Sequence, residues 1–220
     1  MTGAIAIFVK TPGFSPVKTR LAAGIGKEHA ESWFRSAAEA TASVVVRVTD
    51  DAYWAVAEPS STAAEQWQRL GHIRQGDGTL GERMATVHTE LVRLHGSAVL
   101  VGADTPQLDP AVLGHAFEWI RAPAPRLVIG RCEDGGFWLF GANRALPTSD
   151  WTSVGYGRTD TAHNFRSVLA HHGAWLDLPV LHDVDESADL APAMRELAAL
   201  RHPTDAQCAL YTWTREYLDA

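Results

Sequence analysis

Short apolar runs alternate with longer segments in which apolar residues recur at helical spacing. In the first half of the chain the apolar runs predict buried strands at 4–9 and 98–102 and a second strand along the chain at 53–57, and one more strand is expected at 72–75. The helical spacing predicts helices at 27–47, 61–70 and 110–120, and another that opens from the glycine-rich loop 76–81 and runs to about residue 94. Such β-α-β alternation favours a parallel sheet with right-handed crossovers.

The pattern changes after about residue 122. Apolar runs at 126–130 and 137–141 predict two strands, joined by 131–136 as a hairpin or as a bend between neighbours. Helices are predicted at 159–172, 188–200 and 205–218, with one more strand within 174–181. Neither a linker nor an internal repeat interrupts the chain. We therefore expect one α/β domain over 1–220, in which 123–220 covers a site formed by 1–122, with an antiparallel element added to the parallel sheet.

Composition narrows the class of protein. Apolar residues make up 46% and charged residues 20% of the chain, as in ordinary soluble globular proteins. No apolar run approaches the roughly 20 residues that span a bilayer. The first run lacks a basic segment before it, and the two cysteines are too few for a disulfide framework, so we expect a cytoplasmic protein. A net charge of −7 argues against nucleic-acid binding, so an anionic ligand would need a local basic site.

One carboxylate follows the apolar run at 98–102. Asp104 lies two residues beyond the expected end of this strand, where ligands collect in open α/β sheets. Asp109 is a suitable N-cap and Pro110 suits the first helical position, so the loop is held between a buried strand and a capped helix. Asp104 is positioned either to bind a metal or to accept hydrogen bonds from backbone amides of the turn.

Two further loops carry candidate binding groups. Lys18 and Arg20, in the loop that starts at Lys10, form either a phosphate-binding pair or a solvated basic turn. Asp183 and Asp185 follow the strand within 174–181 and point the same way if the segment is extended. One of them would complete an Mg²⁺ site with Asp104, or Asp185 caps the next helix instead.

The turn Glu133-Asp-Gly-Gly136 also has two interpretations. Its glycines either provide positive φ angles for a hairpin or let a ligand approach the backbone. The neighbouring Cys132 lacks an identifiable base, which disfavours a nucleophilic role. His163, His171 and His172 are predicted in one surface helix and receive no ligand role.

Five short motifs together resemble those of a bacterial family of GT-A-type transferases, related to the nucleotidyltransferases of cofactor biosynthesis. They occur in family order across residues 5–190. The motifs are Phe8-Val-Lys-Thr-Pro-Gly13 with Pro16-Val-Lys-Thr-Arg-Leu21, Leu80-Gly-Glu-Arg-Met84, Gly102-Ala-Asp-Thr-Pro-Gln-Leu108, Glu133-Asp-Gly-Gly-Phe-Trp-Leu139 and Asp183-Val-Asp-Glu186. The segment 18–21 is also similar to that of 2-phospholactate guanylyltransferase. The resemblance implies a Rossmann-like GT-A (nucleotide-diphospho-sugar transferase) fold, with a mostly parallel mixed sheet and helices on both faces.

The resemblance also implies roles for individual residues. Residues 1–122 would form a nucleotide-binding half and 123–220 an acceptor-binding half with terminal helices. In the first half Lys10, Lys18 and Arg20 would hold phosphates, with Leu80 and Gly81 near the base. Asp104 and Asp185 would bind Mg²⁺ or Mn²⁺, although Asp185 is followed by Glu186-Ser187 and not by the Thr-Pro of sugar-nucleotide synthetases. Apart from the resemblance, we expect the turn with Glu133, Gly135 and Gly136 to contribute to ligand binding and to face the acceptor, and Asp134, a carboxylate in a ligand-covered turn, to be the base.

These expectations favour a metal-dependent transferase that moves a glycosyl group from a nucleoside-diphosphate sugar to a small acceptor. Asp104, Asp134 and Lys18 would be its catalytic residues. The first loop lacks the Gly-x-Gly run with which many nucleotidyltransferases hold a triphosphate, which favours a diphosphate-sugar donor. The alternatives are nucleotidyl transfer to a phosphorylated small molecule with release of pyrophosphate, and a non-catalytic nucleotide-binding protein of the same fold.

Overall fold

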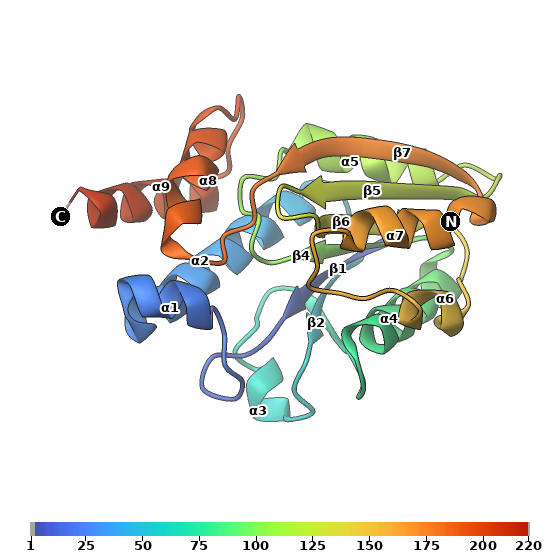
Figure 1. Ribbon diagram of the computed structural model, residues 1–220, viewed down its shortest axis with the longest axis horizontal. Coiled ribbons are helices and arrows are strands. Elements are labelled where there is room, and N and C mark those ends of the chain that lie inside the picture. The colour runs from blue at the N-terminus through green and yellow to red at the C-terminus, as the bar shows by residue number, and fades with distance from the viewer. Residues whose placement is uncertain (1–2, 220) are drawn as a thin grey trace.

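Seven strands form one mixed sheet in the computed structural model, which describes residues 3–219 (Figure 1). The strands are β1 (Ala4–Val9), β2 (Ala52–Val56), β3 (Gly71–Arg74), β4 (Ala98–Gly102), β5 (Arg126–Cys132), β6 (Phe137–Ala142) and β7 (Ala174–Leu181). Their order across the sheet is β3-β2-β1-β4-β6-β5-β7. Neighbouring strands are parallel except at β6, which pairs antiparallel with both β4 and β5. The expected parallel sheet with an antiparallel hairpin is confirmed.

The helices lie in the order that the sequence predicts, with some changes of extent. They are α1 (Thr19–Ile25), α2 (Lys27–Val45), α3 (Ser61–Ala64), α4 (Leu80–His95), α5 (Pro110–Ile120), α6 (Thr148–Thr152), α7 (Thr161–Val168), η1 (Ala170–His172), η2 (Ser187–Asp189), α8 (Leu190–Ala198) and α9 (Asp205–Leu218). Helix α3 has only four residues, so the prediction of a helix over 61–70 was wrong in length. The sequence also missed α1 and α6, which are too short to show helical periodicity. Within the described residues no helix is long and apolar enough to cross a membrane.

Alternating side chains of the strands fill two cores, one on each face of the sheet. In β1, Ile5 and Ile7 pack with apolar residues of α2 and α5, whereas Ala4 and Ala6 pack on the opposite face with residues of α4 and α7. This alternation follows from the two-residue period of a strand. The result is a three-layer arrangement with helices on both faces of the sheet (Figure 1).

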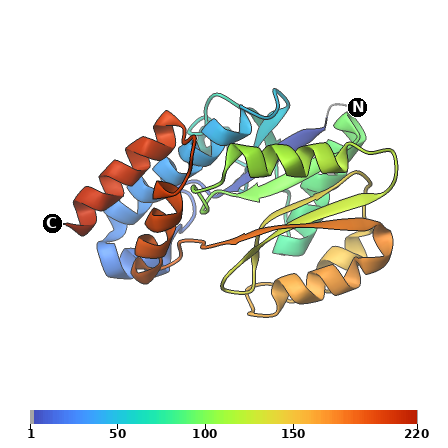
Figure 2. The same cartoon turned by 90° about the horizontal axis from the view of Figure 1, so that it is seen from above.

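The two terminal helices do not cover the sheet. Helices α8 and α9 pack against α1 and α2 in a third core that contains Trp33, Leu190, Met194 and Leu210 (Figure 2). This packing brings the segment between β7 and α8 close to the loop that follows β1. Residues more than 160 positions apart in sequence are thereby placed at one edge of the sheet.

Candidate active site

Asp104 lies just beyond the carboxyl end of β4, in a loop fixed at both ends. The N-cap Asp109 accepts a hydrogen bond from the backbone N–H of Ala111 at 2.8 Å, and Pro110 occupies the first turn of α5, as expected. The backbone N–H of Val184 donates to the carbonyl oxygen of Asp104 at 3.2 Å. Within residues 3–219 no backbone N–H donates to the Asp104 carboxylate, whose recorded partner is the ammonium of Lys18. The structure therefore gives no support to the turn-stabilising interpretation.

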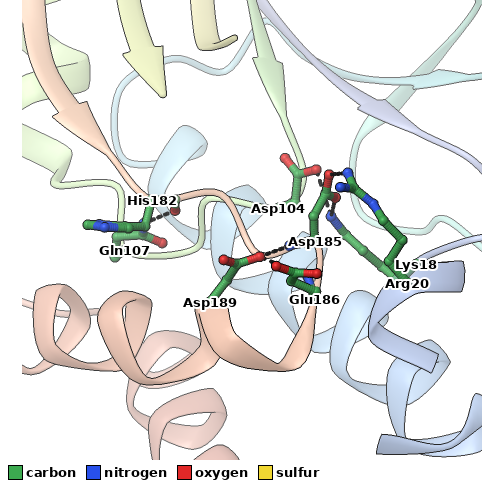
Figure 3. Close-up of polar contacts among 8 residues, drawn as sticks. All are labelled: Lys18, Arg20, Asp104, Gln107, His182, Asp185, Glu186 and Asp189. Atoms are coloured by element: carbon green, nitrogen blue, oxygen red, sulfur yellow. Dashed lines mark hydrogen bonds and ion pairs between the residues drawn. The ribbon is translucent and has the colours of Figure 1, made fainter. Parts of the chain in front are cut away.

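Lys18 joins the two carboxylates that the sequence assigned to a metal. Its Nζ donates to Oδ2 of Asp104 and to Oδ1 of Asp185, at 2.9 Å in each case, so these two oxygens are at most twice that distance apart (Figure 3). The Arg20 guanidinium contacts the other oxygen of Asp185. All four residues meet at the carboxyl edge of the sheet. The sequence predicts that they line one cleft, but Arg20, in the first turn of α1, does not line the cavities found there.

Burial and neighbouring charges determine the protonation of Lys18 and Asp185. The Lys18 side chain is only 6% exposed, whereas that of Arg20 is 68% exposed. Burial alone would lower the pKa of Lys18, but attraction to Asp104 and Asp185 outweighs it and raises the pKa above its usual value. Burial likewise opposes ionisation of Asp185, but Lys18 and Arg20 hold its pKa below the usual range. The Lys18 ammonium and the Asp185 carboxylate are thus charged near neutral pH.

The backbone of Lys18 adopts an unusual conformation. Lys18 is the N-cap of α1, with φ 45° and ψ 46° in the left-handed region that residues other than glycine rarely adopt. Such conformations cost about 1–3 kcal/mol and cluster at functional sites. The two ion pairs of its side chain help to offset this cost.

A neighbouring aspartate, not Asp185, helps to cap the helix after β7. Oδ2 of Asp189 accepts hydrogen bonds from the backbone N–H groups of Asp185 and Glu186, at 2.9 and 2.8 Å. The Asp185 carboxylate is therefore left to the two cations (Figure 3).

A second acidic cluster lies beside Asp104. One ligand atom from each of Cys132, Asp134 and Asp183 lies within 4.8 Å of the others. Burial, followed by repulsion from Asp104, Asp134 and Asp185, raises the pKa of Asp183 to about 6. The same surroundings raise the pKa of the Cys132 thiol, mainly through burial, so that it stays protonated. The site therefore holds more negative charge than Lys18 and Arg20 neutralise.

Two adjoining cavities of about 340 and 230 Å³ form one cleft around these groups. Both are lined by Phe8, Leu80, Gly102 and Asp104. We name the larger one the basic half, because Lys10 and Lys18 line it together with Gln75 and Asp185. The smaller one is the acidic half, lined by Asp104, Asp134 and Asp183 with a largely apolar and aromatic wall; the wall residues include Met84, Leu100, Phe137, Trp138 and Tyr156.

Several predicted positions lie outside the lining of this cleft. A Cβ atom at Gly81 would lie 2.6 Å from the carbonyl oxygen of Trp151, so this glycine allows α4 to approach α6. Gly135 has φ +90°, and a Cβ there would lie 1.9 Å from the carbonyl oxygen of Thr159. Glu133 is exposed and donates its backbone N–H to Leu181. Gly136 does line the acidic half, and its N–H donates to Oδ1 of Asp134 at 2.7 Å.

Sequence reasoning missed three polar residues of the cleft. Gln75 lines the basic half, and its Nε2 donates to the carbonyl oxygens of Val9 and Ala55 at 3.1 and 2.8 Å. Its place at the end of β3 was a usable signal, because ligand-binding residues follow strand ends. Tyr156 lines the acidic half from the irregular segment after α6, and Thr161 lines it from the first residue of α7; neither follows a strand end that would mark it.

The strand order and the charged cleft at the carboxyl edge define an α/β fold of the nucleotide-diphospho-sugar transferase class. The family described as "Uncharacterized protein conserved in bacteria (DUF2064)" matches residues 33–158, and the chain belongs to this family. No curated protein matches the chain in sequence.

Solved structures agree on the fold. A candidate nucleotide-diphospho-sugar transferase from Desulfovibrio desulfuricans G20 matches with a TM-score of 0.86 at 21% identity, over 99% of this chain and 97% of that one. A cytidylyltransferase from Leptospira borgpetersenii serovar Hardjo-bovis matches at 0.55 and 11%, over 100% and 96%. A CMP-2-keto-3-deoxy-manno-octonic acid synthetase in complex with CTP matches at 0.52 and 12%, over 87% and 96%. At these identities the likeness defines the fold, which is the one expected from the sequence.

Proposed function

We propose that the protein is a metal-dependent transferase that binds a nucleotide-activated donor in the basic half of the cleft and an acceptor in the acidic half. The observation that carries this proposal is the junction at Asp104, where Lys18 and the acidic cluster meet. Phosphate oxygens would accept hydrogen bonds from Lys18 and Arg20, with Lys10 at the rim and Leu80 against the base. A structure of similar fold holds CTP, which is consistent with a nucleotide ligand.

The carboxylates suit a divalent cation. Asp104 and Asp185 offer oxygen ligands of the kind that Mg²⁺ and Mn²⁺ prefer. Burial, and after it repulsion from the neighbouring aspartates, raises the pKa of Asp183 beside them, as expected where carboxylates crowd together. The Lys18 ammonium, however, already lies between Asp104 and Asp185. We infer that donor phosphates draw Lys18 away and so free both carboxylates for the metal. When bound, the cation would neutralise charge on the diphosphate.

The charge of the acidic half favours glycosyl transfer over nucleotidyl transfer to a phosphorylated acceptor. Its lining within residues 3–219 includes three aspartates and no lysine, arginine or histidine. A phosphorylated acceptor would meet repulsion there, whereas a neutral or cationic acceptor with an apolar body would fit.

In the proposed reaction an acceptor hydroxyl attacks the anomeric carbon of the donor. The new bond forms as the hydroxyl proton passes to Asp134 and the bond from the anomeric carbon to the diphosphate breaks. Lys18 and Arg20 would hold the departing diphosphate and stabilise its charge. Apolar side chains such as Phe137 and Trp138 would exclude water from the acidic half.

Product analysis separates this proposal from its alternatives. The protein is incubated with UDP-, GDP-, CDP- and ADP-sugars, with Mn²⁺ and a panel of neutral and amine acceptors, and release of nucleoside diphosphate is followed. The proposal predicts nucleoside diphosphate without pyrophosphate. Pyrophosphate formed from a nucleoside triphosphate and a sugar phosphate would establish nucleotidyl transfer instead. Nucleotide binding without turnover of any donor would favour the non-catalytic alternative.

A further inference from the structure

A second group of metal-ligand side chains lies outside the lining of the cleft. Asp150 of α6 and His171 and His172 of η1 each offer one ligand atom, and these three atoms lie within 4.8 Å of one another. The two histidines immediately precede β7, whereas Asp183 and Asp185 follow the other end of that strand. A strand of eight residues spans roughly 25 Å, so the two groups are independent of each other.

The distances between these side chains are close to those between neighbouring ligands of one metal ion. Nε2 of His172 lies 2.7 Å from Oδ2 of Asp150, and the ring centroids of His171 and His172 are 4.1 Å apart. A tetrahedral Zn²⁺ site places its ligand atoms roughly 3.3 Å apart. The Asp150–His172 pair would open slightly on binding. The His171 ring is exposed and forms no hydrogen bond with the described residues. It can therefore rotate and shorten the longest of the distances between the ligand atoms.

The charge of the group also favours a cation. The Asp150 and His172 side chains are about one-fifth exposed, so water only partly screens the Asp150 carboxylate. Among the described residues no lysine or arginine forms an ion pair with Asp150. One carboxylate and two imidazoles form a set that borderline ions such as Zn²⁺ prefer, whereas Mg²⁺ prefers oxygen ligands alone.

We propose that Asp150, His171 and His172 bind one Zn²⁺-class ion that cross-links α6 to η1. This site was not expected from the sequence, which predicts one helix over 159–172. The structure instead ends α7 at Val168 and turns the two histidines toward α6 in a separate 3-10 helix. The ion would cross-link two helical elements that are too short to be stable by themselves.

The test uses tag-free, EDTA-treated full-length protein titrated with ZnCl₂ by calorimetry, with thermal melting as a second readout. The proposal predicts one equivalent of Zn²⁺ bound and a higher melting temperature. His171→Gln, which removes no recorded hydrogen bond, should weaken Zn²⁺ binding about tenfold or more without changing the apo melting temperature. His172→Gln should weaken it as well. The control His163→Gln alters an exposed histidine of α7 and should bind as the wild type does.

Three results would overturn the proposal. They are the absence of stoichiometric Zn²⁺ binding below millimolar concentration, unchanged Zn²⁺ affinity in His171→Gln, and an equal loss in the His163→Gln control.

Discussion

Replacing Lys18 by methionine removes the charge that joins Asp104 to Asp185 and keeps most of the apolar stem. Breaking a fully buried ion pair costs about 3–5 kcal/mol. Each carboxylate here is 33% exposed, so solvent reduces this cost, and we expect a loss of about 3 kcal/mol in the free energy of unfolding at pH 7. In a chain of this length such a loss lowers the melting temperature by about 6–12 °C.

The same variant should acquire a metal response. With the ammonium gone, Asp104 and Asp185 are free to bind Mn²⁺ without nucleotide, and the ion should restore part of the lost stability. The assay is urea unfolding and thermal melting with and without MnCl₂. Lys10→Met is the matched control, because Lys10 lines the same half of the cleft and forms no recorded ion pair within the described residues. A Lys18→Met protein within about 1 kcal/mol of the wild type, and indifferent to Mn²⁺, would refute the reasoning.

Three further predictions follow from the structure. Arg20→Ala should weaken nucleotide binding by about 1.5–3 kcal/mol in calorimetry, with little change in melting temperature because the side chain is largely exposed. Burial lowers the pKa of His88 to about 4 from 6.5, so the folded state resists its protonation. The contribution of His88 to stability should therefore be complete above pH 6.5 and fall by about 3 kcal/mol as the pH drops to 4, which urea titrations should find as a pH-dependent difference between the wild type and His88→Leu. Gly135→Ala should cost about 2 kcal/mol or more by the same method, because its Cβ would overlap Thr159, whereas Gly114→Ala, with nothing within 4 Å of its Cβ, should be neutral or stabilising.

The sequence predicts the fold well where its signals are local. The apolar runs of β4 and β7 and the Asp109-Pro110 cap fix elements whose observed bounds agree with prediction. Helices α1 and α6 were missed because they are short and owe their formation to tertiary packing, α1 against α2 and α6 against α4.

Only part of the candidate site was predictable from the sequence: Asp104, Asp185 and Lys18 were expected in one cleft, whereas Gln75, Tyr156, Thr161 and the contacts among the charged groups were not. Strand ends place Asp104 and Asp185 at the same edge of the sheet, and two cations in one loop indicate an anion site. The insertion of Lys18 between the two aspartates depends on its left-handed backbone and on the packing of α8 and α9, neither of which leaves a periodic pattern in the sequence. Gly81 belongs to a motif shared with the family, but what it faces depends on α6, which the sequence did not reveal.

The most direct test of the account is a calorimetric titration of the wild-type protein with Mn²⁺, alone and in the presence of saturating UDP, GDP, CDP or ADP. If phosphates displace Lys18 from Asp104 and Asp185, at least one nucleotide should raise Mn²⁺ affinity tenfold or more, and Mn²⁺ should raise the affinity for that nucleotide by the same factor. A nucleotide at 100 times its dissociation constant should also add about 2.7 kcal/mol of stability. Mn²⁺ affinity that no nucleotide changes, or the absence of binding by every nucleotide in the panel, would contradict the central claim.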